Sequence, residues 1–195
     1  MTAISALQSI HKKGLFGDHH KKNESDLLNI LEVKDLTIVQ VSQYKKSKLH
    51  LKSISVDRLE LSLQKARVSS NKDTRIIWSG PNTWFVVSKK ENIIEIINKD
   101  CDSEDFAITD ISHSRAVIQM SGPQAKEVLK KGCPFNFNTL ETNNSINSTY
   151  NGIAFTVDML DENPNKVRLF ALRSFGESFY HSITDASLEF GYTSL

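Results

Sequence analysis

Cysteine is scarce in this chain, and it lacks long apolar runs. Only Cys101 and Cys133 occur among 195 residues, with no CxxC pair and no Cys/His spacing typical of a zinc site, so we expect two reduced thiols and no metal. No apolar run approaches the ~20 residues of a membrane-spanning helix, and no secretory-signal pattern opens the sequence. We therefore expect a soluble, cytoplasmic protein without a membrane partner.

Net charge is also nearly absent. The 24 Lys and Arg residues are balanced by 23 Asp and Glu, which gives a formal charge of +1 and disfavours a nucleic-acid partner. Hydrophobic residues (39%) and charged residues (24%) are present at the values of ordinary globular proteins. A chain of this length can bury roughly 70% of its unfolded surface, so we predict a single domain spanning residues 1–195.

The common motifs of catalysis and cofactor binding are missing as well. The sequence contains no GxGxxG and no GxxxxGK[ST], the glycine-rich loops that hold dinucleotides and nucleotides. It contains no GxSxG and no HExxH, the signatures of common hydrolases. We therefore expect no nucleotide cofactor, and in particular no flavin, in this chain.

The first 26 residues differ from the remainder. Ile4, Leu7 and Ile10 recur three apart before Lys12, Lys13 and Gly14, a pattern that predicts a short helix. The polar stretch 17–26 is interpreted as a mobile connector. The core is accordingly expected over residues 27–192.

A hairpin followed by a helix is predicted in the first half of the core. Apolar and β-branched runs at 75–78 and 83–87 flank the turn residues 79–82. Ser88 and Glu91 have the spacing of a capping box and predict a helix over 89–99.

The same order recurs near the C-terminus. Strands are predicted at 153–159 and 167–172, followed by a helix opened by Ser174 with Glu177 as its capping partner and ended by Gly191. Two hairpin-plus-helix units that could share one core predict a duplicated α+β fold.

The segments around these units are less regular. Alternation predicts two strands within 27–43, whereas 48–63 is ambiguous. A strand at 115–120 precedes a helix opened by Pro123 and ended by a left-handed Gly132. The Asn-rich stretch 136–151 is predicted to be the longest loop.

One dense polar cluster occupies residues 109–115. Its Asp110, Ser112 and His113 are the residue types of a catalytic set, but Asp110 and His113 would point to opposite faces of a strand. The favoured interpretation is that Asp110 and Ser112 hold a turn while Arg115 makes a charge-assisted bond. Arg115 and Arg173 stand out because only six of the 24 basic residues are arginine, and buried ion pairs are favoured for them over partner contacts.

Three segments resemble the γ subunits of heterotetrameric sarcosine oxidase. They are TDISHSRAVIQMSGP with VLKKGCP (109–123 and 128–134), WSGPNTW (78–84) and RSFGE (173–177). The resemblance implies a fold related to the folate-binding domain of glycine-cleavage aminomethyltransferases, which agrees with the duplication.

The resemblance also implies a function in sarcosine catabolism and one-carbon metabolism. The chain would be a non-catalytic assembly subunit, inactive alone and without cofactors. Large α and β subunits would carry FAD, FMN, NAD and tetrahydrofolate. That complex demethylates sarcosine to glycine, passes the one-carbon unit to tetrahydrofolate and reduces oxygen to hydrogen peroxide. Candidate interface or ion-pair residues are Trp84, Asp110, Arg115, Arg173 and Tyr180.

Two alternatives remain. The complex could act on another N-methyl amino acid. The chain could also be a free-standing folate-binding protein, such as a tRNA-modifying factor of the same superfamily. Such a factor is expected to carry KGCYxGQE, whereas Lys131-Gly132-Cys133 continues here with Pro134 and Phe135.

Overall fold

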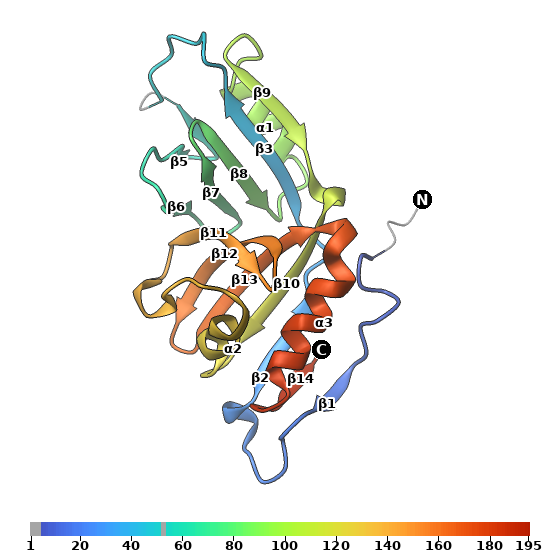
Figure 1. The fold of residues 1–195 in the computed structure, drawn as a ribbon. Helices are drawn as coiled ribbons and strands as arrows, with labels where there is room; N and C mark the ends of the chain where they lie inside the picture. Colours follow the sequence, from blue (N-terminus) through green and yellow to red (C-terminus); the bar gives the residue numbers. More distant parts are fainter. Residues whose placement is uncertain (1–4, 52–53) are drawn as a thin grey trace. The chain divides into compact units, whose positions relative to one another are not determined.

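The computed structural model describes residues 5–51 and 54–195, and within the chain the contacts form two compact units (Figure 1). The described part of unit 1 comprises residues 5–34, Ser114–Thr142 and Ile146–Leu195. The described part of unit 2 comprises residues 35–51, 54–113 and Asn143–Ser145. No helix in the described residues is long and apolar enough to cross a membrane.

Unit 1 is built on a seven-stranded sheet with the strand order β1-β14-β2-β10-β13-β12-β11. The pairs are antiparallel wherever register is recorded, except that β14 runs parallel to β2. The strands are β1 (Gly14–Phe16), β2 (Leu28–Glu32), β10 (Arg115–Ser121), β11 (Ser145–Tyr150), β12 (Ile153–Glu162), β13 (Asn165–Leu172) and β14 (Tyr192–Ser194).

Two helices contact this sheet and enclose its core. They are α2 (Ala125–Gly132) and α3 (Gly176–Ser187), which touch each other and strand β13. Phe179 and Ile183 are four residues apart on α3 and fully buried, as are Val128 and Leu129 on α2. Helical spacing thus places the apolar side chains of each helix on one buried face.

Unit 2 has its own five-stranded sheet, ordered β6-β7-β8-β3-β9, and a separate β4-β5 hairpin. Helix α1 (Ile93–Asp100) buries Ile93 and Ile97 in the same hydrophobic cluster as Val39 and Val41. The strands are β3 (Thr37–Gln43), β4 (Ser55–Val56), β5 (Leu59–Glu60), β6 (Val68–Ser70), β7 (Thr74–Gly80), β8 (Thr83–Ser88) and β9 (Phe106–Asp110).

The α+β class and its duplication are confirmed. The hairpin β7-β8 is followed by α1, and the hairpin β12-β13 is followed by α3. Each unit contains one hydrophobic cluster of buried residues, with Phe179 and Ile183 in the cluster of unit 1 and Ile93 and Ile97 in that of unit 2. Each hairpin has one helix of its own to cover it, which suffices to bury its apolar face.

The predicted N-terminal helix is wrong over its described residues. Ile4 lies outside them, and residues 6–10 form turns in which the backbone N–H groups of Ile10 and His11 both donate to the carbonyl of Leu7. A single hydrogen-bonded turn does not make a helix, because fixing the backbone of the first turn costs more free energy than its hydrogen bonding contributes.

Both predicted capping boxes are wrong as well. Ser88 accepts a hydrogen bond from the N–H of Lys90, but α1 begins at Ile93, after an N-cap without a side-chain bond. Residues 173–175 form a 3-10 turn before α3, and Phe175 is 50% exposed instead of lying on the buried face. In both places, the Ser-x-x-Glu pattern indicates the turn that precedes the helix and not the N-cap of the helix.

Gly132 has a different role from the predicted left-handed one. It is the last residue of α2, and an added Cβ would lie 2.7 Å from the ring of Tyr150. Close approach, not a positive φ, requires glycine here. Gly191 adopts φ +71°, but α3 ends at Ser187 with Leu188 as its C-cap, so the predicted helix end at Gly191 is wrong. The predicted loop 136–151 instead contains a 3-10 turn at Phe137–Thr139 and strand β11.

Candidate functional site

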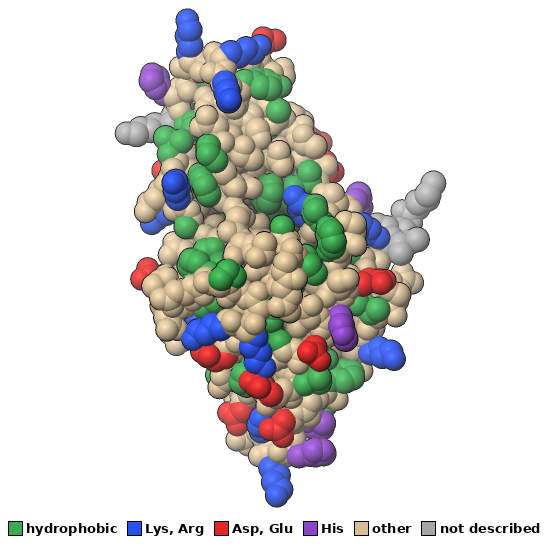
Figure 2. All heavy atoms as spheres, in the orientation of Figure 1, with side chains coloured by type: hydrophobic (Ala, Val, Ile, Leu, Met, Phe, Trp, Pro, Cys, Tyr) green, Lys and Arg blue, Asp and Glu red, His purple; other side chains and the backbone are tan. Residues whose placement is uncertain are grey.

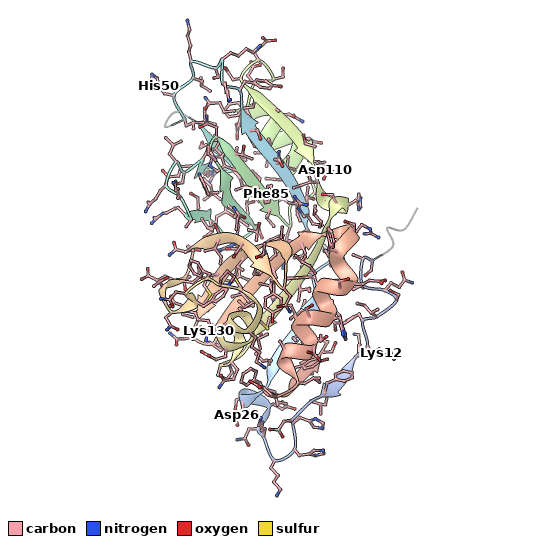
Figure 3. The ribbon with its side chains drawn as sticks, in the orientation of Figure 1. Lys12, Asp26, His50, Phe85, Asp110 and Lys130 are labelled. Carbon is pink, nitrogen blue, oxygen red and sulfur yellow. The ribbon has the colours of Figure 1, made fainter. Side chains whose placement is uncertain are left out.

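Asp110 lies at the end of β9, where it holds a turn as predicted (Figure 3). Its Oδ1 accepts hydrogen bonds from the backbone N–H and the hydroxyl of Ser112. The Ser112 hydroxyl also accepts a bond from the N–H of Ile38 at 2.9 Å. His113 follows in an exposed 3-10 turn. Asp110 and Ser112 therefore join β9 to β3, and their polar atoms are used structurally.

The two predicted arginines lie near one end of the same strand pair. Arg115 begins β10 and is in register with Leu172, the residue before Arg173. Burial lowers the pKa of the Arg115 guanidinium, which nevertheless remains charged at neutral pH. Both arginines have interactions within the chain. Whether these are the predicted ion pairs stays a prediction.

Trp84 and Tyr180, two of the candidate interface or structural residues, are buried within the chain itself. Trp84 is fully buried in unit 2, and its indole N–H donates to the carbonyl of Ser62 at 2.8 Å. Tyr180 is 5% exposed, and its hydroxyl shares a 3.2 Å hydrogen bond with Ser194. Aromatic residues are enriched in cores and interfaces alike, so the sequence could not separate the two.

The described part of unit 1 contains a cavity of about 370 Å³ beside α3. One wall is the N-terminal segment that includes β1, and the other is the outer face of α3 with β14. Lys12 is labelled on the N-terminal segment alongside α3 in Figure 3. The lining residues are Ile10, Lys12, Phe16, Glu177, Ser178, Tyr180, His181, Thr184 and Tyr192.

The N-terminal segment that forms this wall is anchored at both of its ends by contacts with the rest of unit 1. Ser5 donates a hydrogen bond to the carboxylate of Glu32 on β2 at 2.6 Å, and Ser9 donates to the carboxylate of Glu177 on α3. At the other end, Phe16 stacks on Tyr192 with ring centroids 5.2 Å apart, because β1 pairs with β14 at these residues. The wall is therefore part of the folded unit.

Two buried phenols form the floor of the cavity, and both are neutral at physiological pH. Burial raises the pKa of Tyr180, an effect that the bond with Ser194 opposes and Glu32 reinforces. Burial also raises the pKa of Tyr192, with Tyr180 adding to the increase and a hydrogen bond with Thr184 opposing it. Neither phenol can serve as a general base near neutral pH.

Charged side chains of both signs surround this floor. Figure 2 shows basic, acidic and histidine side chains next to hydrophobic ones in the region of α3 and the N-terminal segment. Lys12, Glu177 and His181 are exposed lining residues. Among residues 5–51 and 54–195, no group of three His, Cys, Asp or Glu side chains has the geometry of a metal site. The cavity thus offers binding groups, with Tyr180 the one predicted site residue that lines it.

Comparison with known proteins finds chains that are similar to this one in sequence and in fold. No family model matches the chain. The sarcosine oxidase subunit γ of Corynebacterium sp. (strain U-96) is 29% identical over 121 residues, which are 60% of this chain and 58% of that protein. The chain is similar to this γ subunit. The match spans less than two thirds of the length of that relative.

Solved structures extend the similarity to the fold. A chain of heterotetrameric sarcosine oxidase from Corynebacterium sp. U-96, in complex with pyrrole 2-carboxylate, superposes with a TM-score of 0.80 at 20% identity. That match covers 96% of this chain and 95% of the other. The glycine cleavage system aminomethyltransferase T of Bartonella henselae gives a TM-score of 0.58 at 11% identity, covering 80% of this chain and 45% of that one. Both identities are low, so these matches show a shared fold.

Proposed function

We propose that this chain is a γ-type, non-catalytic assembly subunit of a heterotetrameric sarcosine oxidase. The observation that carries the proposal is the TM-score of 0.80 over 96% of this chain and 95% of a chain of such a complex. The 29% identity to a subunit named γ supports the same assignment. A subunit whose whole length matches one chain of a complex is best explained as the counterpart of that chain.

In this proposal, the chemistry belongs to other subunits. Large α and β chains carry FAD, FMN, NAD and tetrahydrofolate, and together they demethylate sarcosine in the cytoplasm. The polar groups of this chain that most resemble catalytic ones support such a division. Asp110 and Ser112 hydrogen-bond to each other, and Tyr180 and Tyr192 have raised pKa values. These groups stabilise the fold and are not poised for proton transfer.

A free-standing folate-binding function is the second candidate. The TM-score of 0.58 to an aminomethyltransferase favours it, because the fold is shared. Titration of the purified chain with tetrahydrofolate separates the candidates. The assembly proposal expects no saturable binding to the isolated chain, whereas stoichiometric binding supports the second candidate.

The assembly proposal is tested by co-expression with tagged α and β subunits. We expect the chain to be captured in a one-to-one ratio with them and to remain bound through size-exclusion chromatography. Permanent interfaces of this kind bury well over ~1,600 Å² in total, so dilution should not release the chain. Recovery of an α–β complex that excludes the chain would contradict the proposal.

A matched pair of variants locates the contact. Phe175 is 50% exposed at the start of α3, next to Arg173, and exposed aromatic residues are common interface anchors. We expect Phe175→Ala to weaken capture by about 1–2 kcal/mol without lowering the stability of the free chain. Lys72→Ala, at an exposed turn of unit 2, serves as the control and should leave capture unchanged.

A further inference from the structure

The cavity beside α3 has the composition of a small-molecule site. Its volume of about 370 Å³ lies at the lower end of the range for ligand pockets, roughly 300–1,000 Å³. Phe16, Tyr180 and Tyr192 supply aromatic surface on three different elements. An apolar ring can contact this surface through stacked or edge-on arrangements.

The charged residues at this cavity do not neutralise each other. The side chain of Lys12 forms no hydrogen bond or ion pair with any other residue in 5–51 and 54–195. The recorded hydrogen bond of the Glu177 carboxylate is to the neutral hydroxyl of Ser9, through Oε1. A carboxylate has about four acceptor positions, so Glu177 keeps the capacity to bind a cation. One ammonium and one carboxylate thus line the same cavity without pairing.

A further polar atom in this wall lacks a partner. His11 lies between the lining residues Ile10 and Lys12, and its ring contacts Tyr180 edge-on with centroids 5.6 Å apart. The Nε2 atom of His11 is buried and has no hydrogen-bond partner in the described residues. Buried polar atoms in folded proteins usually have a protein or water partner, so a water molecule or a polar group of a ligand can pair with this atom.

We propose that this cavity binds a zwitterionic amino acid with an apolar side chain. Lys12 holds the ligand carboxylate, Glu177 holds the ligand ammonium, and the apolar side chain lies on the aromatic floor. A purely anionic ligand would be repelled by Glu177, and a purely cationic one would be repelled by Lys12. The inference goes beyond the assembly function and does not depend on it.

Three probes of similar shape test the charge requirement on the full-length chain. L-phenylalanine carries both charges, 3-phenylpropionate carries only the carboxylate, and phenethylamine carries only the ammonium. Dissociation constants are measured by saturation-transfer NMR titration. Exposed ion pairs contribute modestly, so we expect L-phenylalanine to bind about threefold to fivefold more tightly than either other probe.

Two variants add a crossed pattern. Lys12→Gln should weaken the binding of L-phenylalanine and 3-phenylpropionate, which carry a carboxylate, but not that of phenethylamine. Glu177→Gln should weaken the binding of L-phenylalanine and phenethylamine, which carry an ammonium group, but not that of 3-phenylpropionate. Lys12 and Glu177 are both exposed, and glutamine can still accept the Ser9 hydrogen bond, so both variants should fold. Lys13→Gln and Glu95→Gln, which are exposed and do not line the cavity, are the controls.

Each outcome decides the proposal. Tighter binding of L-phenylalanine together with the crossed pattern supports it. Equal or tighter binding of a singly charged probe overturns it, as does an effect of the control variants equal to that of the lining variants. Absence of saturable binding for all three probes also overturns it, and none of these results bears on assembly with other subunits.

Discussion

Replacing Gly132 with alanine tests the packing of unit 1 quantitatively. Gly132 ends α2, where alanine should gain about 0.5–1 kcal/mol through its higher helix propensity. The new Cβ, however, would lie 2.7 Å from two ring carbons of Tyr150, a distance that Cβ contacts essentially never show. The sign of the effect depends on whether that ring can move.

The ring of Tyr150 is held from several sides. Its hydroxyl donates to the carbonyl of Val128 at 3.0 Å, and Phe155 and Phe179 contact it edge-on with centroid distances of 6.0 and 6.1 Å. Overpacking at such a site costs about 1–3 kcal/mol. Subtracting the middle of the helix gain from the middle of the overpacking cost leaves an expected loss of about 1 kcal/mol in the free energy of unfolding.

Urea denaturation followed by far-UV circular dichroism measures this loss. Both tryptophans belong to unit 2, so tryptophan fluorescence reports separately on that unit. Gly80→Ala is the control because, among the described residues, no atom other than those of Gly80 and its two chain neighbours lies within 4 Å of the position that its new Cβ would take. In a Tyr150→Leu background, Gly132→Ala should become neutral or stabilising. An unchanged or increased stability of Gly132→Ala with Tyr150 intact would show that the ring does not resist the added methyl group.

Three further perturbations have definite expected results. His11→Phe removes a buried nitrogen without a described partner and keeps the edge-on contact with Tyr180, so the free energy of unfolding should rise or stay unchanged. A decrease above ~1 kcal/mol would show that the nitrogen makes a stabilising hydrogen bond. Burial tends to raise the pKa of Asp57, but hydrogen bonds, first of all from Lys90 at 2.6 Å, outweigh it and hold that pKa below its ordinary value. Because the folded-state pKa is depressed, this stabilisation is complete above the unfolded pKa of about 4 and is lost as pH falls through the folded pKa. Asp57→Asn should lower the free energy of unfolding by about 1 kcal/mol at neutral pH and make the stability of unit 2 fall less steeply as the pH is lowered. An unchanged pH dependence in the variant would contradict this prediction. Burial, reinforced by a neighbouring aspartate, raises the pKa of Cys101 to about 12, so Ellman's reagent should modify it only after unfolding, and rapid modification of the native chain would contradict this.

The sequence predicted the elements whose signals are local. The hairpins β7-β8 and β12-β13 are predictable because β-branched runs flank turn residues, and the predicted strand that begins at Arg115 is confirmed as β10. Strands β1 and β14 were missed. They are three residues long and pair with each other from opposite ends of the chain, so no local pattern encodes them.

The site was less predictable than the fold. The turn held by Asp110 and Ser112 follows from side-chain chemistry over two residues, and it was foreseen. The cavity joins residues near position 12 with residues near 180 and 192, so only the tertiary structure brings Lys12 and Glu177 together. One signal was available: Glu177, Tyr180, His181 and Thr184 recur at helical spacing on a second face of α3.

The assembly function is tested most directly by producing the α and β subunits with and without this chain. We predict that the complex containing the chain is recovered in higher yield or turns over sarcosine faster, and that the chain alone forms no peroxide from sarcosine. Equal yield and equal sarcosine turnover of the α and β subunits without the chain would contradict the assembly proposal.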